Sequence, residues 1–270
     1  MEYKMIFLDL DGTLVNSKHE IMPKTKEALL KAQSKGIKVV LASGRPTPGM
    51  VSLAQELELE KNDGYILSYN GGCIISCKTG EIVYNKIIEA DEMQEIFKMA
   101  EKYNVDLLSY DKETVITNND KNKFVQIEAE INKIPLIEVK NMQEYITYPV
   151  NKFIFLEEGD YLEKIEPEVA KDLPAFSVYR SAPFFLEIMP YGIDKANSME
   201  ILAKKLGISM TETIACGDGY NDLGLIKAAG LGVAMGNAIK EVLSIADYIT
   251  ESNNNEGIAH VVEKFIFKKC

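Results

Sequence analysis

Residues 5–14, Met-Ile-Phe-Leu-Asp-Leu-Asp-Gly-Thr-Leu, constrain the fold more than any other stretch of the chain. A short apolar run that ends in Asp-Gly predicts a fully buried parallel strand followed by a turn. Asp9 and Asp11 then lie at the carboxyl end of that strand, where open α/β sheets bind their ligands. Residues i and i+2 of a strand point the same way, so both carboxylates can face one point. A hard divalent cation bound through oxygen would relieve their mutual repulsion and attract a phosphate.

The same residues also fit an ordinary turn or the start of a calcium-binding loop. An EF-hand loop that opens at Asp9 places Glu20 at its twelfth position, as that loop requires. Val15, however, offers only a carbonyl, and no helix precedes Asp9. We therefore favour a strand end that binds a metal and a phosphate, with Asp9 placed to attack phosphorus and Asp11 to act as acid and base.

The composition narrows the class of protein. The 270 residues are 46% hydrophobic, enough for one large core or two modest ones. No apolar run reaches the length of a membrane span, and no signal peptide is evident. The four cysteines are irregularly spaced, which predicts free thiols in a reducing cytoplasm rather than a disulfide framework or a zinc site. They are Cys73, Cys77, Cys216 and Cys270. The net charge of −11 disfavours binding to nucleic acid, which needs a basic surface.

The charge is concentrated in the middle of the chain. Residues 85–188 carry 12 Lys+Arg and 21 Asp+Glu, a net of −9, which leaves −2 for the other 166 residues. This contrast predicts an inserted domain.

The two flanks of that insert alternate strands with helices. Apolar and β-branched runs predict strands over 5–10, 37–42, 65–69, 213–216, 231–234 and 248–250. Apolar spacing with Pro and Gly at the ends predicts helices over 23–35, 194–206 and 223–229, and a short helix that ends at about residue 57. This alternation predicts an α/β fold with a Rossmann-like parallel sheet. The insert has a different pattern: two hairpins, 105–110 with 114–118 and 176–180 with 184–189, and a strand over 152–156 predict an α+β unit on one antiparallel sheet.

Each predicted strand end in the flanks carries polar residues. Taken singly, Ser43 fits a turn or a helix N-cap, Lys195 a solvated helix residue, and Gly217-Asp218-Gly219 a turn. Taken together, they supply what phosphoryl transfer to a carboxylate needs: a nucleophile, an acid, donors for the phosphoryl oxygens, a cation and metal ligands.

These residues belong to longer motifs: Asp9-Leu10-Asp11-Gly12-Thr13-Leu14, Ser43-Gly44-Arg45, Asn70-Gly71-Gly72, Gly192-Ile193-Asp194-Lys195, Gly217-Asp218-Gly219-Tyr220-Asn221-Asp222, Gly232-Val233-Ala234-Met235-Gly236-Asn237-Ala238 and Ala246-Asp247-Tyr248-Ile249-Thr250. The order of these motifs and the residues in them resemble those of the haloacid dehalogenase superfamily, in particular its Cof-type sugar-phosphatase branch. The resemblance covers both flanks, and covers the insert only by its size, position and hairpins.

The resemblance implies a role for each residue. Asp9 would form an aspartyl-phosphate, while Asp11 would protonate the leaving alcohol and then deprotonate the attacking water. Mg²⁺ would be bound by the Asp9 carboxylate, the Asp11 backbone carbonyl and Asp218, with Asp222 orienting Lys195 or a metal-bound water. The donors to the phosphoryl oxygens would be Ser43, the Leu10 and Gly44 backbone amides, Lys195 and Asn221.

The chain has only two arginines, Arg45 and Arg180, and both are candidates to bind the substrate. Arg180 has an equal alternative, which is to pair with a carboxylate of the insert. The resemblance implies that residues 1–84 and 190–270 form the hydrolase core, and that residues 85–189 form a cap domain that closes over the substrate and selects it, with hinges near 82–86 and 189–192.

The expected function is Mg²⁺-dependent hydrolysis of small phosphorylated metabolites such as sugar phosphates, by a cytoplasmic monomer or weak homodimer without nucleic-acid or membrane partners. A phosphomutase or other phosphotransferase would use the same intermediate. A phospho-acceptor switch without turnover also combines acidic pairs, a hydroxyl and a lysine, but Asp11-Gly-Thr supplies an acid that a slow switch does not need. A binding protein on an inactive scaffold is disfavoured, because each expected catalytic position is filled.

Overall fold

The computed structural model describes residues 2–111 and 113–267. The chain divides into two compact units. The core unit comprises Met1–Arg45, Met50–Tyr84 and Asp194–Cys270, and the inserted unit comprises Pro46–Gly49 and Asn85–Ile193. Cys270, one of the four cysteines noted above, lies outside the described residues.

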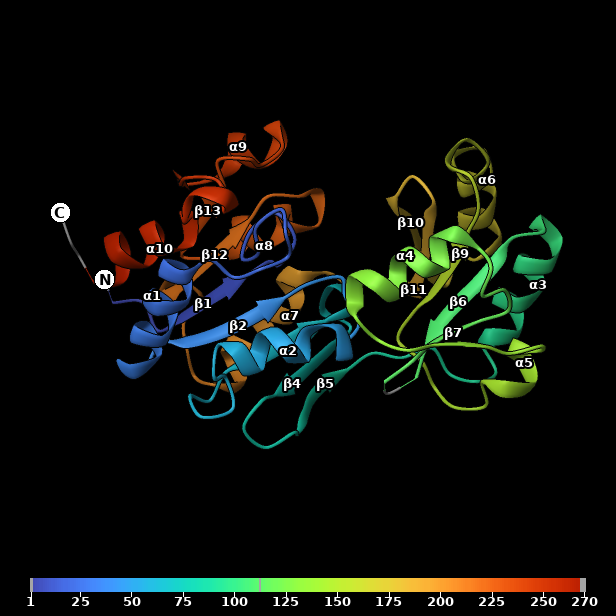
Figure 1. Cartoon of the computed structure of the whole chain (residues 1–270), viewed down its shortest axis with the longest axis horizontal. Helices are drawn as coiled ribbons and strands as arrows, with labels where there is room; N and C mark the ends of the chain where they lie inside the picture. The colour runs from blue at the N-terminus through green and yellow to red at the C-terminus, as the bar shows by residue number, and fades with distance from the viewer. Residues whose placement is uncertain (1, 112, 268–270) are drawn as a thin grey trace. The chain divides into compact units, whose positions relative to one another are not determined.

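The core unit is built on an eight-stranded sheet in the order β14-β13-β12-β1-β2-β3-β4-β5 (Figure 1). Its strands are β1 (Met5–Leu8), β2 (Lys38–Ala42), β3 (Tyr65–Ser68), β4 (Cys73–Ser76), β5 (Ile82–Asn85), β12 (Thr213–Gly217), β13 (Leu231–Ala234) and β14 (Tyr248–Ile249). The six strands from β14 to β3 are parallel, and β4 is antiparallel to β3. The central strand β1 therefore has β2 on one side and β12 on the other.

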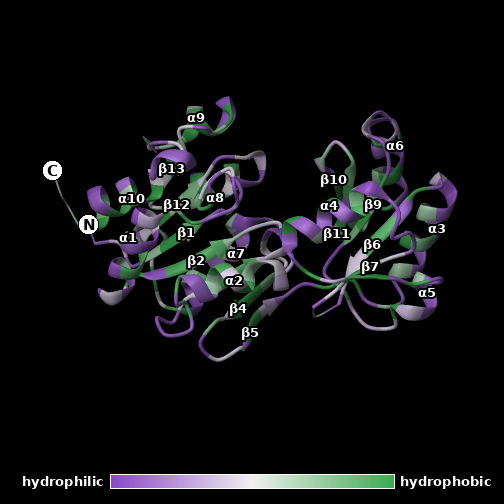
Figure 2. Cartoon of the chain, viewed as in Figure 1, coloured by the Kyte–Doolittle hydropathy of each residue, from purple (hydrophilic) through white to green (hydrophobic). Residues whose placement is uncertain are grey.

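Both faces of this sheet are covered by helices, which explains why its central strands β1, β12 and β13 are buried throughout rather than alternating. The helices are α1 (Pro23–Ser34), α2 (Pro48–Glu56), α7 (Lys195–Lys205), α8 (Leu223–Ala228), α9 (Lys240–Ile245) and α10 (Gly257–Val261). Ile6 and Leu8 pack in one apolar cluster with side chains of α1, α2 and α10. Met5 and Phe7 point to the opposite face and pack with side chains of α7 and α8. Figure 2 shows the apolar colour concentrated in the central strands.

The inserted unit has its own six-stranded sheet, in the order β10-β11-β9-β6-β7-β8. The strands are β6 (Asp106–Tyr110), β7 (Val115–Thr117), β8 (Leu136–Glu138), β9 (Phe153–Leu156), β10 (Phe176–Ala182) and β11 (Phe185–Pro190), and the helices are α3 (Met93–Tyr103), α4 (Lys123–Asn132), α5 (Met142–Tyr145) and α6 (Gly159–Asp172). One face of the sheet packs against apolar side chains of α3, α5 and α6 in a separate core.

Helix α3 shows how the sequence defines these elements. Its buried residues recur at helical spacing: Met93, Ile96, Phe97, Ala100 and Tyr103. The helix ends at Asn104, whose φ of 49° places it in the left-handed region that favours asparagine as a C-cap.

The predicted α/β class with a parallel-sheet core is confirmed, and so are both predicted hairpins of the insert. The predicted antiparallel sheet of the insert is present, with the exception that its edge strand β8 pairs with β7 in parallel. Strands β4, β5 and β8 were not predicted. Each is only three or four residues long. In addition, β5 and β8 have no fully buried residue, so these two strands lack the apolar pattern of a core strand.

The three described cysteines, Cys73, Cys77 and Cys216, are free thiols, as predicted. Among the described residues, no helix combines the length and the apolarity that crossing a membrane requires.

Candidate active site

Asp9 follows directly after β1, and its backbone continues the pairing of that strand with β12. Its N–H donates to the Cys216 carbonyl at 3.1 Å, which directs the buried side chain to the carboxyl edge of the sheet. The Asp9 Oδ1 atom accepts a hydrogen bond from Lys195 Nζ at 2.6 Å. The other carboxylate oxygen, Oδ2, accepts none from the described residues. Asp9 is thus held by one oxygen and has the other available.

Lys195 is the first residue of α7 and is fully buried. The N-cap Asp194 starts the helix by accepting from the Asn197 N–H at 2.7 Å. The Lys195 ammonium lies 2.6 Å from Asp9 Oδ1 and 2.7 Å from Asp222 Oδ1. Burial alone would lower the pKa of Lys195, but the Asp222 and Asp9 carboxylates outweigh burial and raise it. Lys195 therefore stays charged at neutral pH and lies between two carboxylates.

Asp218 and Asp222 lie in the loop that follows β12. The Asp222 Oδ2 atom accepts from the backbone N–H groups of Asp218 and Gly219, both at 3.0 Å, so both oxygens of this buried carboxylate have partners. Asp218 Oδ1 accepts from the Thr13 hydroxyl at 2.8 Å, while Oδ2 accepts from no described residue. Asp222 therefore fixes Lys195 and the loop, and Asp218 keeps one oxygen available.

Gly12 allows Asp218 to lie this close to the turn after β1. Its φ is +86°, and a Cβ at this position would lie 2.2 Å from Asp218 Oδ2. Any other residue would both strain the backbone and displace the carboxylate.

The acidic cluster fits a hard divalent cation. Single oxygens of Asp9, Asp218 and Asp222 lie within 4.8 Å of one another. Burial and the nearby Asp222 raise the pKa of Asp9 well above its usual range. Burial also raises the pKa of Asp218 to about 6. Three carboxylates against one ammonium leave excess negative charge, and oxygen ligands of this type suit Mg²⁺. Since Asp222 is already committed to Lys195 and to backbone donors, Asp9 and Asp218 are the two carboxylates that could bind it.

The neutral candidates for phosphate binding lie at neighbouring strand ends. Ser43 is buried immediately after β2, and its N–H donates to the Leu67 carbonyl at 2.9 Å. Leu10 has a buried side chain, so only its backbone can face a ligand. Asn221 is exposed in the loop after β12, and its Nδ2 donates to Asn70 Oδ1 at 3.0 Å.

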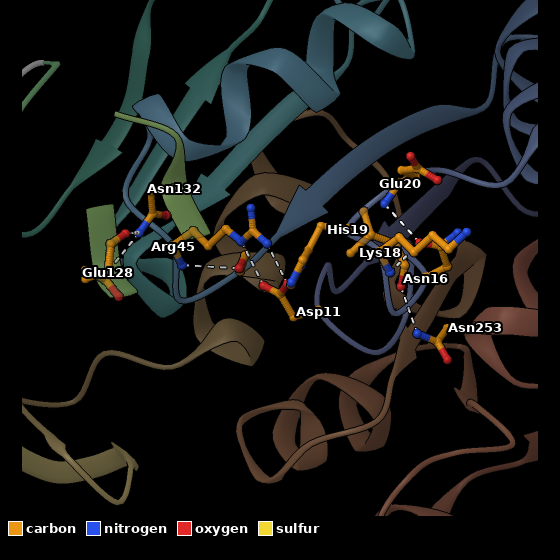
Figure 3. Close-up of polar contacts among 11 residues, drawn as sticks. Asp11, Asn16, Lys18, His19, Glu20, Arg45, Glu128, Asn132 and Asn253 are labelled. Atoms are coloured by element: carbon orange, nitrogen blue, oxygen red, sulfur yellow. Dashed lines mark hydrogen bonds and ion pairs between the residues drawn. The ribbon is translucent and has the colours of Figure 1, made fainter. Parts of the chain in front are cut away.

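Asp11 has two basic neighbours (Figure 3). Arg45 Nε and Nη2 lie 2.8 Å and 2.5 Å from its two carboxylate oxygens. His19 Nδ1 lies 3.3 Å from the same carboxylate. Arg45, which we expected to bind the substrate, is thus paired with Asp11 in this structure. His19 was not predicted, because no motif includes it: a φ of 58° in the loop after Asp11 turns it back toward that residue.

Arg180 belongs to the inserted unit and pairs with carboxylates of α6. Its Nε lies 2.8 Å from Glu166 Oε2, and its Nη1 lies 3.6 Å from Glu163 Oε2. Of the two alternatives for Arg180, the structure shows the pairing within the insert. The other predicted site residues all lie in the core unit. Thr13 and Asn70, which stood in the sequence motifs without a role, are added to the site by their bonds to Asp218 and Asn221.

The chain resembles proteins of one family over nearly its whole length. A family model described as haloacid dehalogenase-like hydrolase matches residues 6–262. The "Putative phosphatase YxeH" of Bacillus subtilis is 34% identical over 99% of this chain and 100% of its own length. The crystal structure of a haloacid dehalogenase-like hydrolase from Bacteroides thetaiotaomicron is 43% identical, with a TM-score of 0.94 over 97% of this chain and 99% of that chain. The subclass IIB sugar phosphatase BT4131 is 27% identical, with a TM-score of 0.81 over 97% and 98% of the two chains.

Proposed function

The chain belongs to the haloacid dehalogenase-like hydrolases, and from the geometry of its site we propose that it is a magnesium-dependent phosphatase of small phosphorylated metabolites. The observation that carries this proposal is the arrangement of Asp9. Lys195 holds one oxygen of this buried carboxylate, and the other oxygen accepts no hydrogen bond from the described residues. A carboxylate that is fixed in place yet keeps one oxygen available is suited to nucleophilic attack.

In the first step of the proposed reaction, Asp9 attacks the phosphorus atom. A bond forms between the carboxylate oxygen and phosphorus, the ester bond breaks, and Asp11 gives its proton to the leaving alkoxide. In the second step, Asp11 takes a proton from water as that water attacks phosphorus. The bond to Asp9 breaks, and inorganic phosphate leaves.

Asp11 must exchange a proton in both steps, and its contact with Arg45 bears on this. Arg45 contacts both oxygens of this carboxylate, at 2.5 Å and 2.8 Å. We propose that Asp11 leaves Arg45 when a substrate binds, because its carboxyl group must then reach the leaving oxygen.

The residues around Asp9 also bind and orient the phosphoryl group. The Ser43 hydroxyl, the Leu10 and Gly44 backbone amides and Asn221 would donate hydrogen bonds to its oxygens. Lys195 would neutralise part of its charge. Asp9, the Asp11 backbone carbonyl and Asp218 would hold Mg²⁺, which when bound supplies positive charge to the phosphoryl oxygens.

Sugar phosphates are the proposed class of substrate. The support is the similarity to the sugar phosphatase BT4131 over 97% of this chain. We propose that the inserted unit acts as the cap domain that selects the leaving group. The core residues named in the preceding paragraph would contact only the phosphoryl group and the metal. Because one fold serves many substrates, the particular sugar phosphate must be found by assay.

Steady-state hydrolysis of p-nitrophenyl phosphate, with Mg²⁺ and with EDTA, tests the proposal. Wild-type protein should release inorganic phosphate only with Mg²⁺, and Asp9→Asn should lose at least about 1,000-fold in kcat. Asp63→Asn is the matched control, because Asp63 lies in the same unit, is half-buried and pairs with surface lysines. Equal activity of Asp9→Asn and Asp63→Asn would refute the aspartyl-phosphate. A phosphomutase would instead return the phosphoryl group to a sugar, without net release of inorganic phosphate.

A further inference from the structure

Three consecutive residues after β3 adopt left-handed backbone conformations. The φ angles are 53° at Tyr69, 52° at Asn70 and 100° at Gly71. Glycine adopts this region freely and asparagine tolerates it, but a bulky residue such as tyrosine is strained there. Such strain persists only where surrounding contacts enforce it, and it is concentrated at functional sites. The turn also follows a strand end of the core sheet, beside the one that carries Ser43.

The backbone of this turn is bonded to two segments of the site. The Asn70 N–H donates to the Ser43 carbonyl at 2.9 Å, and the Tyr69 N–H donates to the Arg45 carbonyl at 3.0 Å. On the other side, the Gly71 carbonyl accepts from the Ser198 hydroxyl of α7 at 2.7 Å. The left-handed turn therefore connects the serine loop to the helix that begins with Lys195.

The side chain of Asn70 reaches the third segment, the loop after β12. It is 94% buried, and its Oδ1 accepts from Asn221 Nδ2 at 3.0 Å. The same carboxamide lies against Gly44, where an added Cβ would be only 3.2 Å from both of its polar atoms. Asn70 thus contacts both Asn221 and Gly44, two of the proposed phosphate donors, while its own backbone holds Ser43.

We propose that Asn70 is a positioning residue that fixes the Asn221 carboxamide for binding of the phosphoryl group; this rests on the proposed phosphatase function. Asn221 Nδ2 carries two hydrogens. Because Asn70 Oδ1 accepts one of them, the rotation of the carboxamide is fixed, and the direction of the second hydrogen is fixed with it. Without Asn70, the exposed Asn221 side chain would rotate among its staggered conformations and offer that hydrogen only part of the time.

Asn70→Gly tests this interaction, because glycine keeps the left-handed backbone and removes only the carboxamide. Asn104→Gly makes the same change at another left-handed asparagine, the exposed C-cap of α3 in the inserted unit. Asn221→Ala and the double variant Asn70→Gly/Asn221→Ala complete a double-mutant cycle. For each protein we would measure kcat and KM with p-nitrophenyl phosphate and Mg²⁺, competitive inhibition by inorganic phosphate, and the melting temperature.

The expected result is that Asn70→Gly loses about 10- to 100-fold in kcat/KM, as is typical for residues that orient a ligand-binding group. Inhibition by inorganic phosphate should weaken in parallel, and Asn104→Gly should match the wild type. The double variant should lose far less than the product of the two single losses, because both remove one interaction. A purely structural role would lower the melting temperature without this coupling.

Two results would overturn the positioning role: an Asn70→Gly protein with wild-type kinetics, or full losses that multiply in the double variant. If Asn70→Gly does not fold, Asn221→Ala alone can still refute the proposal. A wild-type response to inorganic phosphate in that variant would remove the binding role that Asn70 is proposed to support. An inactive wild-type protein would instead refute the phosphatase function, so the two failures are distinguishable.

Discussion

Among the described residues, each unit of the protein buries one lysine almost completely, and the two lysines have different surroundings. In the core unit, Lys195 lies between Asp9 and Asp222 at the end of the sheet, and Asp9 keeps one oxygen that accepts no hydrogen bond from the described residues. In the inserted unit, Lys152 pairs with Glu187 at 3.1 Å, and Tyr179 also donates to that glutamate, at 3.3 Å. The core lysine belongs to a cluster with excess negative charge, whereas the charges of the second pair balance. Only the first arrangement is suited to bind further charged groups.

The difference between the two buried lysines can be tested first at Lys195. Lys195→Met should lower kcat/KM for phosphate ester hydrolysis by about 1,000-fold, because it removes a fixed positive charge beside Asp9 and frees Asp222. Lys204→Met, at an exposed position of the same helix, is the control. If Lys195→Met lowered kcat/KM by less than about tenfold, Lys195 would not have the proposed role in the reaction. The two buried lysines would then not differ in their importance for activity.

Lys152 should matter for stability. Lys152→Met leaves Glu187 buried without its cation, which should lower the free energy of unfolding by about 3 kcal/mol in urea denaturation. The double variant Lys152→Met/Glu187→Leu removes both charges and should recover most of that loss. Exposed Lys140→Met is the control. If the double variant were as unstable as the single one, the ion pair would be required by the fold rather than tolerated.

The burial of Asp218, and secondly its proximity to the Asp222 carboxylate, predict a pH dependence of stability. The pKa of Asp218 is raised to about 6, against about 3.9 in an unfolded chain, so the folded state binds more protons between these values. In EDTA, the contribution of Asp218 to stability should therefore fall as pH rises from about 4 to about 6, by about 1–2 kcal/mol. The measurement is the difference in unfolding free energy between wild type and Asp218→Asn, which lacks this titration. If the unfolding free energy of wild type relative to Asp218→Asn rose with pH, the predicted direction would be wrong. Added Mg²⁺ should oppose the predicted decrease in stability, because it binds the folded state.

The smallest effect is expected at Arg180, since its guanidinium is already paired with Glu166 and Glu163. Arg180→Ala should change kcat/KM by less than about twofold across a panel of phosphorylated metabolites, and stability by no more than about 1 kcal/mol. A selective rise of KM for one substrate would show that Arg180 exchanges its carboxylate partners for a substrate anion. The inserted unit would then carry a charged binding residue of its own.

The same contrast explains what the sequence could predict. In the core unit, each site residue lies at the end of an apolar strand or at a helix start, so local pattern alone indicates that Asp9, Ser43, Lys195 and Asp218 share one edge of the sheet. In the inserted unit, Lys152 directly precedes β9, and it reaches Glu187 because the register of β9 and β11 places Glu187 opposite Ile154. No local motif records that register, and neither residue was singled out beforehand.

Within the core unit, the unpredicted contacts depend on loop conformation. Arg45 and His19 both contact Asp11, but only the folded loop, with His19 at positive φ, brings them there. Asn70 was visible in its motif, yet its partner Asn221 is 151 positions away. Strand and helix patterns therefore predicted the strand ends and the polar residues that they carry, while the contacts of Arg45 and His19 with Asp11 and of Asn70 with Asn221 required the structure.

The position of β1 between β2 and β12 has a consequence for how the protein is made. Asp9 precedes the inserted unit in the chain, whereas Lys195, Asp218 and Asp222 all lie beyond it. At about 5–20 residues per second, a ribosome needs roughly 10–40 s to proceed from β1 to β12. Throughout that interval the nascent chain carries Asp9 but lacks Lys195 and the loop that carries Asp218 and Asp222. The inserted unit, whose sheet and apolar core are contiguous in sequence apart from Pro46–Gly49, can fold meanwhile. The cluster of Asp9, Lys195, Asp218 and Asp222 can therefore assemble only after β12 and the loop that follows it have been synthesised.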